Sequence, residues 1–470
     1  MPKPVPQEQV RIDRRSAAPI HQQVYDRIRT AIAEGRLTPG GRLPSTRSLA
    51  IQLGVARGTV DTAYARLAGE GYITGRGQSG TIVSPALRAN ILPTSAPSKP
   101  LPAIAEPAQP LLPFRMGLPA LDLFPRKLWS RLAVREARRL SKASLAYPDP
   151  LGLPALREAI ASYLAVSRGI ACRPDQIVVT GGYQAALNLV AGLLLAPGDN
   201  VWFEDPGYGF ARDALQSLSM RLAPVPVDGE GLLVAHGERY FLGARLAVVT
   251  PAHQSPLGVC LSLPRRLALL AWAAKAGSWI LEDDYDCEFH YSGHKPPALK
   301  SIDGADRVFY AGSFSKTLFP GLRLGYLVLP SFFIAKAASA CRVQHRGEAG
   351  FGQAIVAAFM GDGHFARHLR RMRLHYKARR QALADALTAA FGDDIGLSLP
   401  PGGLHILARF PNHGDDMALA KRALRHGLQP SPLSAQSIKH EAGQGLLMSF
   451  TNIPEKSAPE IAALLRRALR

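Results

Sequence analysis

The first 84 residues alternate short amphipathic helices with turns. Apolar side chains recur every fourth position over 20–34, which is the spacing of one helix face. A second helix is expected from Ser45 or Thr46, either of which can cap it, and a third from about Arg57. Two short apolar runs flank the glycine-rich turn 75–80 and predict a β-hairpin. This order predicts a helix-turn-helix followed by a wing.

A change of composition then marks a linker. Residues 84–113 contain eight prolines, which prevent a continuous helix and remove the amide donors that a central strand needs. We therefore expect a DNA-binding domain over 1–83, a proline-rich linker over 84–113, and a large domain over 114–470.

After the linker, long amphipathic segments alternate with short apolar runs. Such alternation is typical of an α/β domain with a mainly parallel sheet. The predicted helices include 155–167, 184–195 and 265–276, and the predicted strands are 177–180, 201–204, 246–250, 279–283, 307–311 and 325–329.

Composition limits the kind of protein. Lys and Arg outnumber Asp and Glu by 56 to 36, a net charge of +20 that favours a polyanionic partner. No apolar run has the length of a membrane span and the start of the chain lacks a signal-peptide core, so we expect a cytoplasmic protein without membrane contact. The four cysteines are far apart and predict neither disulfides nor a metal site.

One group of residues has the chemistry to hold pyridoxal phosphate. The Lys316 amine can form a Schiff base with its aldehyde, the Asp283 carboxylate can keep its pyridine nitrogen protonated, and Arg323 can bind its phosphate bidentately. A lone lysine is usually a solvated surface charge. The combination with Asp283, and with Tyr285 two residues further on, favours the cofactor hypothesis. The Gly-rich turn 180–184 follows an apolar strand and opens a helix, so it can receive phosphate or serve only as a turn.

The motifs resemble two known families joined in one chain. Segments 43–50 and 53–60 resemble the winged helix-turn-helix of GntR-type bacterial repressors. Segments 282–285 and 312–316 resemble fold-type-I aminotransferases. The chain is therefore similar to the MocR subfamily of GntR regulators over nearly its whole length. That resemblance implies a fold-type-I, pyridoxal 5'-phosphate-dependent aminotransferase-like domain behind a small winged helix-turn-helix domain.

The resemblance also implies roles for individual residues around the cofactor. Lys316 resembles the Schiff-base lysine, Asp283 the partner of the pyridine nitrogen, and Tyr285 the donor to the ring hydroxyl. Tyr208 resembles the aromatic residue that stacks on the ring. Tyr147 resembles the tyrosine that reaches the phosphate of the partner subunit, which predicts a homodimer. The implied phosphate contacts of the same chain are Gly182, Tyr183, Gln184, Ser313, Ser315 and Arg323.

In the first domain, the helix-turn-helix pattern suggests which side chains meet double-stranded DNA. Arg47, Arg57 and Thr59 are expected at or just before the start of the recognition helix, where side chains reach base edges. The residues expected to contact phosphate are Arg42, Ser45 and the wing residue Arg76. The basic run 367–380 in the large domain is interpreted as a solvated helix face, with DNA contact as an alternative.

Two departures from the aminotransferase pattern bear on function. The segment 445–450 lacks the arginine that binds a substrate carboxylate, although Arg409, Arg212 or His405 could replace it. The loop 250–258 lacks the usual Asn-Pro-Thr-Gly, and His253 in it can either orient the cofactor or satisfy its own loop.

These features favour a transcription regulator that senses a small amine, an amino acid or pyridoxal phosphate itself, rather than an enzyme. The alternatives are an active aminotransferase that carries a DNA-binding domain and a cofactor store. The winged helix argues against both, and residual half-transamination is compatible with the regulator hypothesis.

Overall fold

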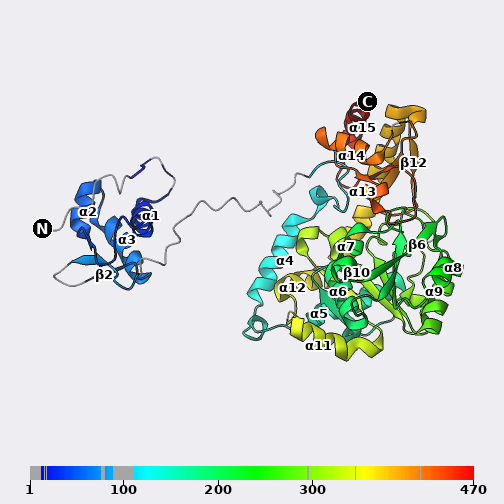
Figure 1. Ribbon diagram of the computed structural model, residues 1–470, viewed down its shortest axis with the longest axis horizontal. Helices are drawn as coiled ribbons and strands as arrows, with labels where there is room; N and C mark the ends of the chain where they lie inside the picture. Colours follow the sequence, from blue (N-terminus) through cyan, green and yellow to red (C-terminus); the bar gives the residue numbers. More distant parts are fainter. Residues whose placement is uncertain are drawn as a thin grey trace. The chain divides into compact units, whose positions relative to one another are not determined.

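The computed structural model describes residues 12–14, 16, 18–75, 80–87, 111–293, 296–344, 346–412 and 414–470. The chain divides into two compact units, one within residues 1–109 and one within residues 110–470 (Figure 1).

The N-terminal unit contains three helices and a small antiparallel sheet. Ser45 caps the second helix, because its hydroxyl accepts a hydrogen bond from the Ser48 amide at 3.1 Å, and Gly54 ends that helix with a φ of 61°. The sheet has the order β1-β3-β2. The elements are α1 (Ile20–Ala33), β1 (Arg42–Leu43), α2 (Thr46–Leu53), α3 (Arg57–Gly69), β2 (Ile73–Gly75) and β3 (Thr81–Val83).

A single core joins these elements. Val24 and Ile28 of α1 are buried against Val60 and Leu67 of α3. The Tyr64 hydroxyl donates a hydrogen bond to the Pro44 carbonyl at 2.9 Å, which ties α3 to the segment before α2. The predicted helices and hairpin are therefore present, because their apolar spacing matches the faces that pack together.

The large unit is built on an eight-stranded sheet. Its order is β4-β11-β10-β9-β8-β5-β6-β7. Five neighbouring strands from β10 to β6 run parallel, whereas β11 runs antiparallel to both of its neighbours. The strands are β4 (Ile177–Thr180), β5 (Asn200–Asp205), β6 (Arg221–Asp228), β7 (Gly231–Leu232), β8 (Leu246–Val249), β9 (Trp279–Asp284), β10 (Val308–Ser313) and β11 (Gly325–Val328).

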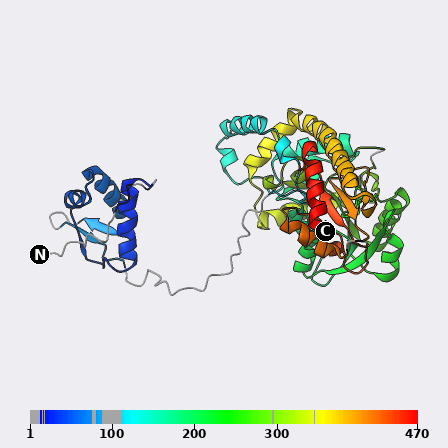
Figure 2. The same cartoon turned by 90° about the horizontal axis from the view of Figure 1, so that it is seen from above.

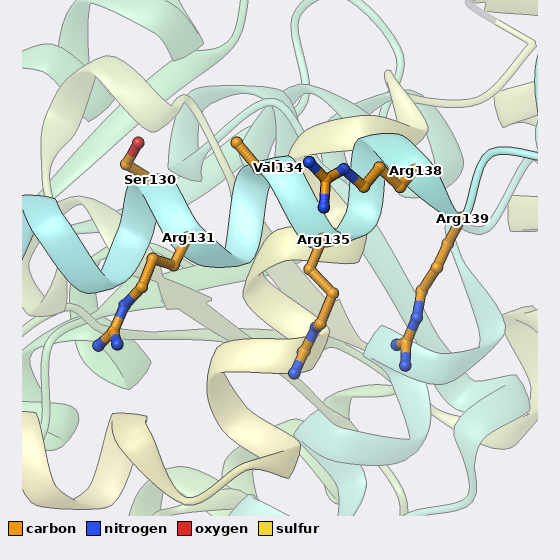
Figure 3. Close-up of a pocket in the computed structure, with 6 residues that line it drawn as sticks. All are labelled: Ser130, Arg131, Val134, Arg135, Arg138 and Arg139. Atoms are coloured by element: carbon orange, nitrogen blue, oxygen red, sulfur yellow. The ribbon is translucent and has the colours of Figure 1, made fainter.

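Helices cover both faces of this sheet. Phe309 of β10 packs in the cluster formed with α6, α7 and α11, whereas its neighbour Tyr310 packs in the cluster on the opposite face. Burial on both faces explains the continuous apolar runs of the parallel strands. Helix α4 carries the outward arginines drawn in Figure 3. The helices are α4 (Arg126–Arg138), α5 (Pro154–Arg168), α6 (Tyr183–Leu194), α7 (Gly209–Ser217), α8 (Val234–Tyr240), α9 (Leu263–Ala276), α10 (Phe314–Thr317), α11 (Ile334–Gln344) and α12 (Gly350–Gly361).

The C-terminal part of the large unit adds an antiparallel sheet with three helices. Its strand order is β12-β13-β15-β14, and α13 packs lengthwise against α15 (Figure 2). The elements are α13 (His364–Phe391), β12 (Gly396–Ser398), β13 (His405–Arg409), α14 (Asp416–Arg425), β14 (Ser431–Pro432), β15 (Leu446–Ser449) and α15 (Ala458–Leu469).

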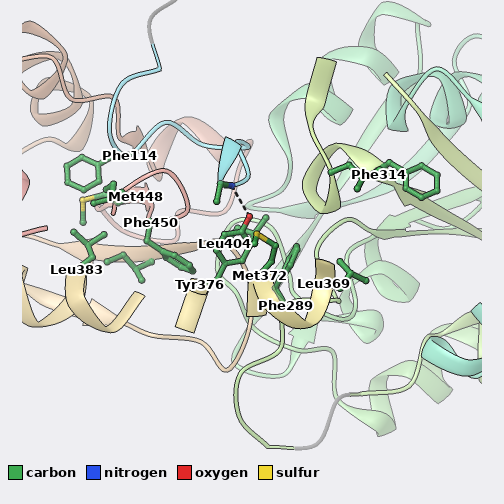
Figure 4. Packing of buried hydrophobic residues seen from close by; sticks show 14 of the residues in the cluster. Phe114, Phe289, Phe314, Leu369, Met372, Tyr376, Leu383, Leu404, Met448 and Phe450 are labelled. Carbon is green, nitrogen blue, oxygen red and sulfur yellow. Dashed lines mark hydrogen bonds between the residues drawn. The ribbon is translucent and has the colours of Figure 1, made fainter. Parts of the chain in front are cut away.

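The basic run 367–380 is only partly a solvated face, which corrects the sequence-based interpretation. Met372 and Tyr376 are buried in the main core, where the Tyr376 hydroxyl accepts a hydrogen bond from the Ala120 amide at 2.9 Å (Figure 4). Arg379 is also buried and forms an ion pair with Asp122 at 2.5 Å. One side of this helix thus belongs to the core, because its apolar residues recur at helical spacing among the charges.

The residues that the structure describes show neither a metal-binding group nor a membrane-spanning helix. The four cysteines are free, two of them buried and two half-buried. In this part of the chain no three His, Cys, Asp or Glu residues group as a metal site would require. None of the helices placed by the structure has the length and apolar character to cross a membrane.

Candidate functional site

Lys316 lies just beyond the end of β10, in the short helix α10. Its amine is buried and donates a hydrogen bond to the Gly117 carbonyl at 2.8 Å. Burial lowers the pKa of the Lys316 amine, and the carboxylates of Asp286 and Asp283 raise it in part. An amine with a lowered pKa is more often unprotonated near neutral pH, which is the form that attacks a carbonyl group.

Asp283 lies near the carboxyl end of β9, beside β10. The register of the two parallel strands pairs Asp283 with Ala311, so the strand ends that carry Asp283 and Lys316 are neighbours. Asp283 is 5% exposed, and burial raises the pKa of its carboxyl group well above the ordinary value, with Asp284 raising it further. The Tyr183 hydroxyl lies beside this carboxylate and lowers the pKa of Asp283 in part. A buried carboxylate of this kind favours a cationic ligand.

Tyr285 belongs to a buried polar cluster beside Asp283. The His253 Nδ1 lies 3.1 Å from the Tyr285 hydroxyl and 3.2 Å from an Asp286 carboxylate oxygen. The His253 and His405 rings lie 5.6 Å apart. His253 therefore contacts residues outside its own loop, and its role toward the cofactor stays a prediction.

The glycine turn before α6 approaches the Arg323 side chain. Gly182 has a φ of 103°, and a Cβ there would lie 3.9 Å from the Arg323 guanidinium group. A Cβ on Gly325 would lie 3.1 Å from the Gly182 Cα, so β11 passes close behind the turn. The N-terminal amides of α6 and the guanidinium group thus lie together, an arrangement that suits a bound anion.

The two predicted serines adjoin this turn through the sheet. Ser313 pairs with Gly325, which in turn pairs with Thr180 at the end of β4. The Ser313 hydroxyl accepts a hydrogen bond from the Ser315 amide at 3.1 Å, so it caps α10. Gln184, in the first turn of α6, has an exposed side chain.

The two predicted aromatic residues differ in position. Tyr208 lies 6.1 Å from Tyr183 between ring centres. Burial raises the pKa of Tyr208 to about 12, Asp283 also raises it, and Arg323 lowers it, so both charged groups act on Tyr208. Tyr147 is 78% exposed, and the Arg346 guanidinium group lies over its ring at 5.2 Å. Within one chain, Tyr147 is therefore outside the cluster.

The three groups considered as replacements for the missing carboxylate-binding arginine already have other partners. Arg409 donates to the Ala442 and Gln444 carbonyls at 3.2 and 3.1 Å. Arg212 donates to the Ala435 carbonyl at 3.1 Å. The His405 Nε2 lies 2.9 Å from the Pro256 carbonyl, and burial lowers the pKa of His405 to about 4. His405 is therefore neutral near pH 7.

The predicted DNA-contacting residues lie on two helices and a strand of the N-terminal unit. Arg57 is the first residue of α3 and forms an exposed ion pair with Asp61 at 3.5 Å. Thr59 follows it and is half-buried, whereas Arg47 lies in the first turn of α2 rather than at the start of α3. Arg42 and Ser45 are exposed, and Arg76 lies outside the described residues.

Sequence reasoning missed several residues that hold the site. Gly117 accepts the Lys316 hydrogen bond from 199 positions away, and no sequence signal predicts that contact. Arg168 and Asp284 form a fully buried ion pair at 2.7 Å beneath the strand that carries Asp283. Glu204, the last residue but one of the apolar strand β5, was a detectable signal, and burial raises the pKa of its carboxyl group to about 7.

The fold and these clusters define a class of protein: a winged helix-turn-helix unit joined to an aminotransferase-like unit. Residues 20–83 match the model for bacterial regulatory proteins of the gntR family, and residues 125–440 match aminotransferase class I and II. The chain belongs to the MocR-type regulators of the GntR family, as the sequence motifs predicted.

Three comparisons illustrate this placement. The probable rhizopine catabolism regulatory protein MocR of Rhizobium meliloti is 36% identical, over 97% of this chain and 95% of its own length. The pyridoxine biosynthesis transcriptional regulator PdxR of Corynebacterium glutamicum is 34% identical, over 96% of each chain. The kynurenine aminotransferase of Pyrococcus horikoshii, solved with PMP, has a TM-score of 0.70 and 27% identity, over 77% of this chain and 91% of that one. The aminotransferase-like fold of the large unit is thereby confirmed.

Proposed function

We propose that this chain is a DNA-binding transcription regulator whose aminotransferase-like unit uses pyridoxal 5'-phosphate to sense a small molecule. The observation that carries the proposal is the presence, in one chain, of a gntR-type helix-turn-helix and a buried lysine–carboxylate cluster of the aminotransferase class. Such a chain links the state of a small-molecule site to the occupancy of a DNA site.

The large unit has the features that this cofactor requires. The buried Asp283 carboxylate forms no ion pair with any residue that the structure describes. A carboxylate in this position suits the protonated ring nitrogen of the cofactor. The Gly182 turn and Arg323 provide a place for its phosphate group. When bound, pyridoxal phosphate supplies an aldehyde that bonds covalently to amines and a ring that withdraws electrons.

Each predicted residue then has a role that follows from its position. Lys316 holds the cofactor covalently through its amine, and Asp283 keeps the proton on the ring nitrogen. Tyr285, oriented by His253, donates to the ring hydroxyl. Tyr208 packs on the ring face. The proposed phosphate contacts are Gly182, Tyr183, Gln184, Ser313, Ser315 and Arg323.

In the N-terminal unit, Arg57 and Thr59 reach base edges from the start of α3. Arg47, in α2, contacts the same groove from the neighbouring helix. The proposed phosphate contacts are Arg42, Ser45 and Arg76. Because this unit binds DNA, we place the protein in the cytoplasm.

We further propose that the regulator is a homodimer and not a turnover enzyme. Tyr147 is exposed beside the exposed Leu145. A partner subunit would cover both and would receive the Tyr147 hydroxyl at its phosphate site. Arg409, Arg212 and His405 are all engaged by backbone carbonyls, so the effector is a ligand without an α-carboxylate or pyridoxal phosphate itself.

A reduction experiment tests the cofactor assignment. Purified protein loaded with pyridoxal phosphate is treated with borohydride, and the mass of the intact chain is measured by mass spectrometry. The wild-type chain and the exposed-lysine control Lys275→Ala should retain one cofactor per chain, and Lys316→Ala should retain none. A reducible bond that persists in Lys316→Ala would show that Lys316 does not hold the cofactor. The same samples should shift a fragment of the promoter next to the gene and not a scrambled fragment, and equal binding to both would reject the regulator.

A further inference from the structure

A row of arginines on α4 forms a basic surface far in sequence from the winged helix. A shallow groove of about 530 Å³ runs along the helix (Figure 3). We call its four basic residues, Arg131, Arg135, Arg138 and Arg139, the α4 arginine face. Ser130 and Val134 complete the lining.

The spacing of these arginines suits a repeating anion. Arg131, Arg135 and Arg139 are four residues apart, and Figure 3 shows their side chains extending from the same side of the helix. A helix rises about 1.5 Å per residue, so the three residues follow one another at steps of about 6 Å. Their charges form a line rather than a converging pocket. A polymer of phosphates matches a line of charges better than a single small anion does.

The protein neutralises only part of this charge. Arg135 forms ion pairs with Glu136 at 2.9 Å and with Asp362 at 2.8 Å, and Arg139 lies 3.3 Å from the same Glu136. Arg131 and Arg138 are exposed and form no ion pair with any residue that the structure describes. Two guanidinium groups are therefore available to an external anion.

The helix that carries the α4 arginine face is firmly held. Leu132, on the opposite side, is buried in the main core. Trp129 packs edge-on against Phe319 at 5.4 Å and lies 5.8 Å from Phe359 of α12. A fixed helix presents its charges without a large ordering cost, which favours binding.

The distribution of net charge along the chain also favours a polyanionic partner. The first 84 residues carry 12 Lys or Arg and 6 Asp or Glu, and the remaining residues carry 44 and 30. More than half of the net charge of +20 is therefore outside the winged helix. A polyanionic partner gains from positive charge in both parts of the chain.

We propose that the α4 arginine face is a second contact surface for the DNA phosphate backbone. This proposal rests on the proposed function and extends it. The winged helix selects the DNA sequence, and the aminotransferase-like unit contributes phosphate contacts that carry no sequence information. The surface thereby links the effector-binding unit directly to DNA.

The test is a salt titration of DNA binding by the full-length, cofactor-loaded protein. The variant Arg131→Gln/Arg138→Gln removes the two unpaired charges. The control Arg221→Gln/Arg239→Gln removes two exposed charges on β6 and α8, at the other side of the large unit (Figure 1). Each lost phosphate contact lowers the slope of log affinity against log salt by about 0.9. The α4 variant should thus lose nearly 2 in slope for each subunit whose face contacts the DNA, and for one such subunit the affinity ratio between 50 and 200 mM salt should shrink roughly tenfold.

The outcomes are distinguishable. The proposal predicts that the α4 variant loses affinity for operator and scrambled DNA alike, keeps its base preference and keeps its cofactor, while the control keeps the wild-type slope. An α4 variant with the wild-type slope would overturn the proposal while the regulator function stands. The same holds if light scattering shows that the variant changes the oligomeric state without changing the slope, because the face would then be a subunit interface. A wild-type protein without DNA binding would reject the regulator and this surface together.

Discussion

Replacing Asp283 with Asn should have opposite effects on cofactor binding and on the stability of the cofactor-free protein. The substitution keeps the shape of the side chain and removes its charge. Asp283 is 5% exposed and forms no ion pair with any residue that the structure describes, so a bound cation would supply its ion-pair partner. A charge-assisted hydrogen bond contributes about 1.5 to 3 kcal/mol. Losing it should weaken pyridoxal phosphate binding roughly 10- to 150-fold.

The cofactor-free protein should respond in the other direction. Burial raises the pKa of the Asp283 carboxyl group, so its charged form destabilises the folded state at pH values above the ordinary pKa of about 3.9. Asp283→Asn should therefore raise the melting temperature of the cofactor-free protein at pH 7, and this gain should vanish as the pH falls toward about 4.

Two measurements check this pair of effects. Fluorescence titration with pyridoxal phosphate gives the affinity, and thermal melts of the stripped protein at several pH values give the stability. Asp394→Asn, which changes an exposed carboxylate, serves as the matched control and should change neither. Unchanged cofactor affinity in Asp283→Asn, or a lower melting temperature at pH 7, would refute the role assigned to this carboxylate.

Three further predictions concern other parts of the molecule. Arg57→Ala should cost roughly 1 to 3 kcal/mol of operator binding and relax the preference at one base pair, as measured on a set of single-base operator variants; equal weakening on every sequence would place Arg57 on phosphate instead. Arg168→Met should destabilise the large unit by about 3 to 5 kcal/mol in urea unfolding, because it leaves the buried Asp284 charge unpaired; a loss no greater than that of the exposed-pair control Arg173→Met would contradict this. Amino-group transfer with common amino acids should stay far below the 1 to 10³ per second typical of enzymes, and sustained turnover in that range would favour the aminotransferase alternative.

Much of the fold could be predicted because local signals agreed with tertiary packing. Helix α3 follows from the apolar residues that recur along one of its faces, and the strand Thr81–Val83 follows from the glycine-rich turn before it. β6 was missed, since its Pro224 and Pro226 argue against a strand. Both prolines pair with β5, opposite Phe203 and Asp205, and β7 pairs with the two residues that follow Pro226. The two-residue strands β1 and β14 are too short to show a pattern.

The candidate site was predictable where sheet order alone brings residues together. β9 and β10 are parallel neighbours, so Asp283 and Lys316 had to lie at the same edge. The Gly117 carbonyl and the contact between His253 and Tyr285 depend on long-range packing that no local pattern encodes. The basic run 367–380 was misjudged because its charges concealed a buried apolar stripe.

The central claim is that one chain couples a pyridoxal phosphate site to specific DNA binding. Footprinting of the promoter next to the gene, with the cofactor-loaded and the stripped protein, tests it most directly. The account predicts protection of two repeats on one face of the duplex, with an affinity that changes when the cofactor is removed. Protection without sequence preference in both states, or identical footprints and affinities in both, would contradict it.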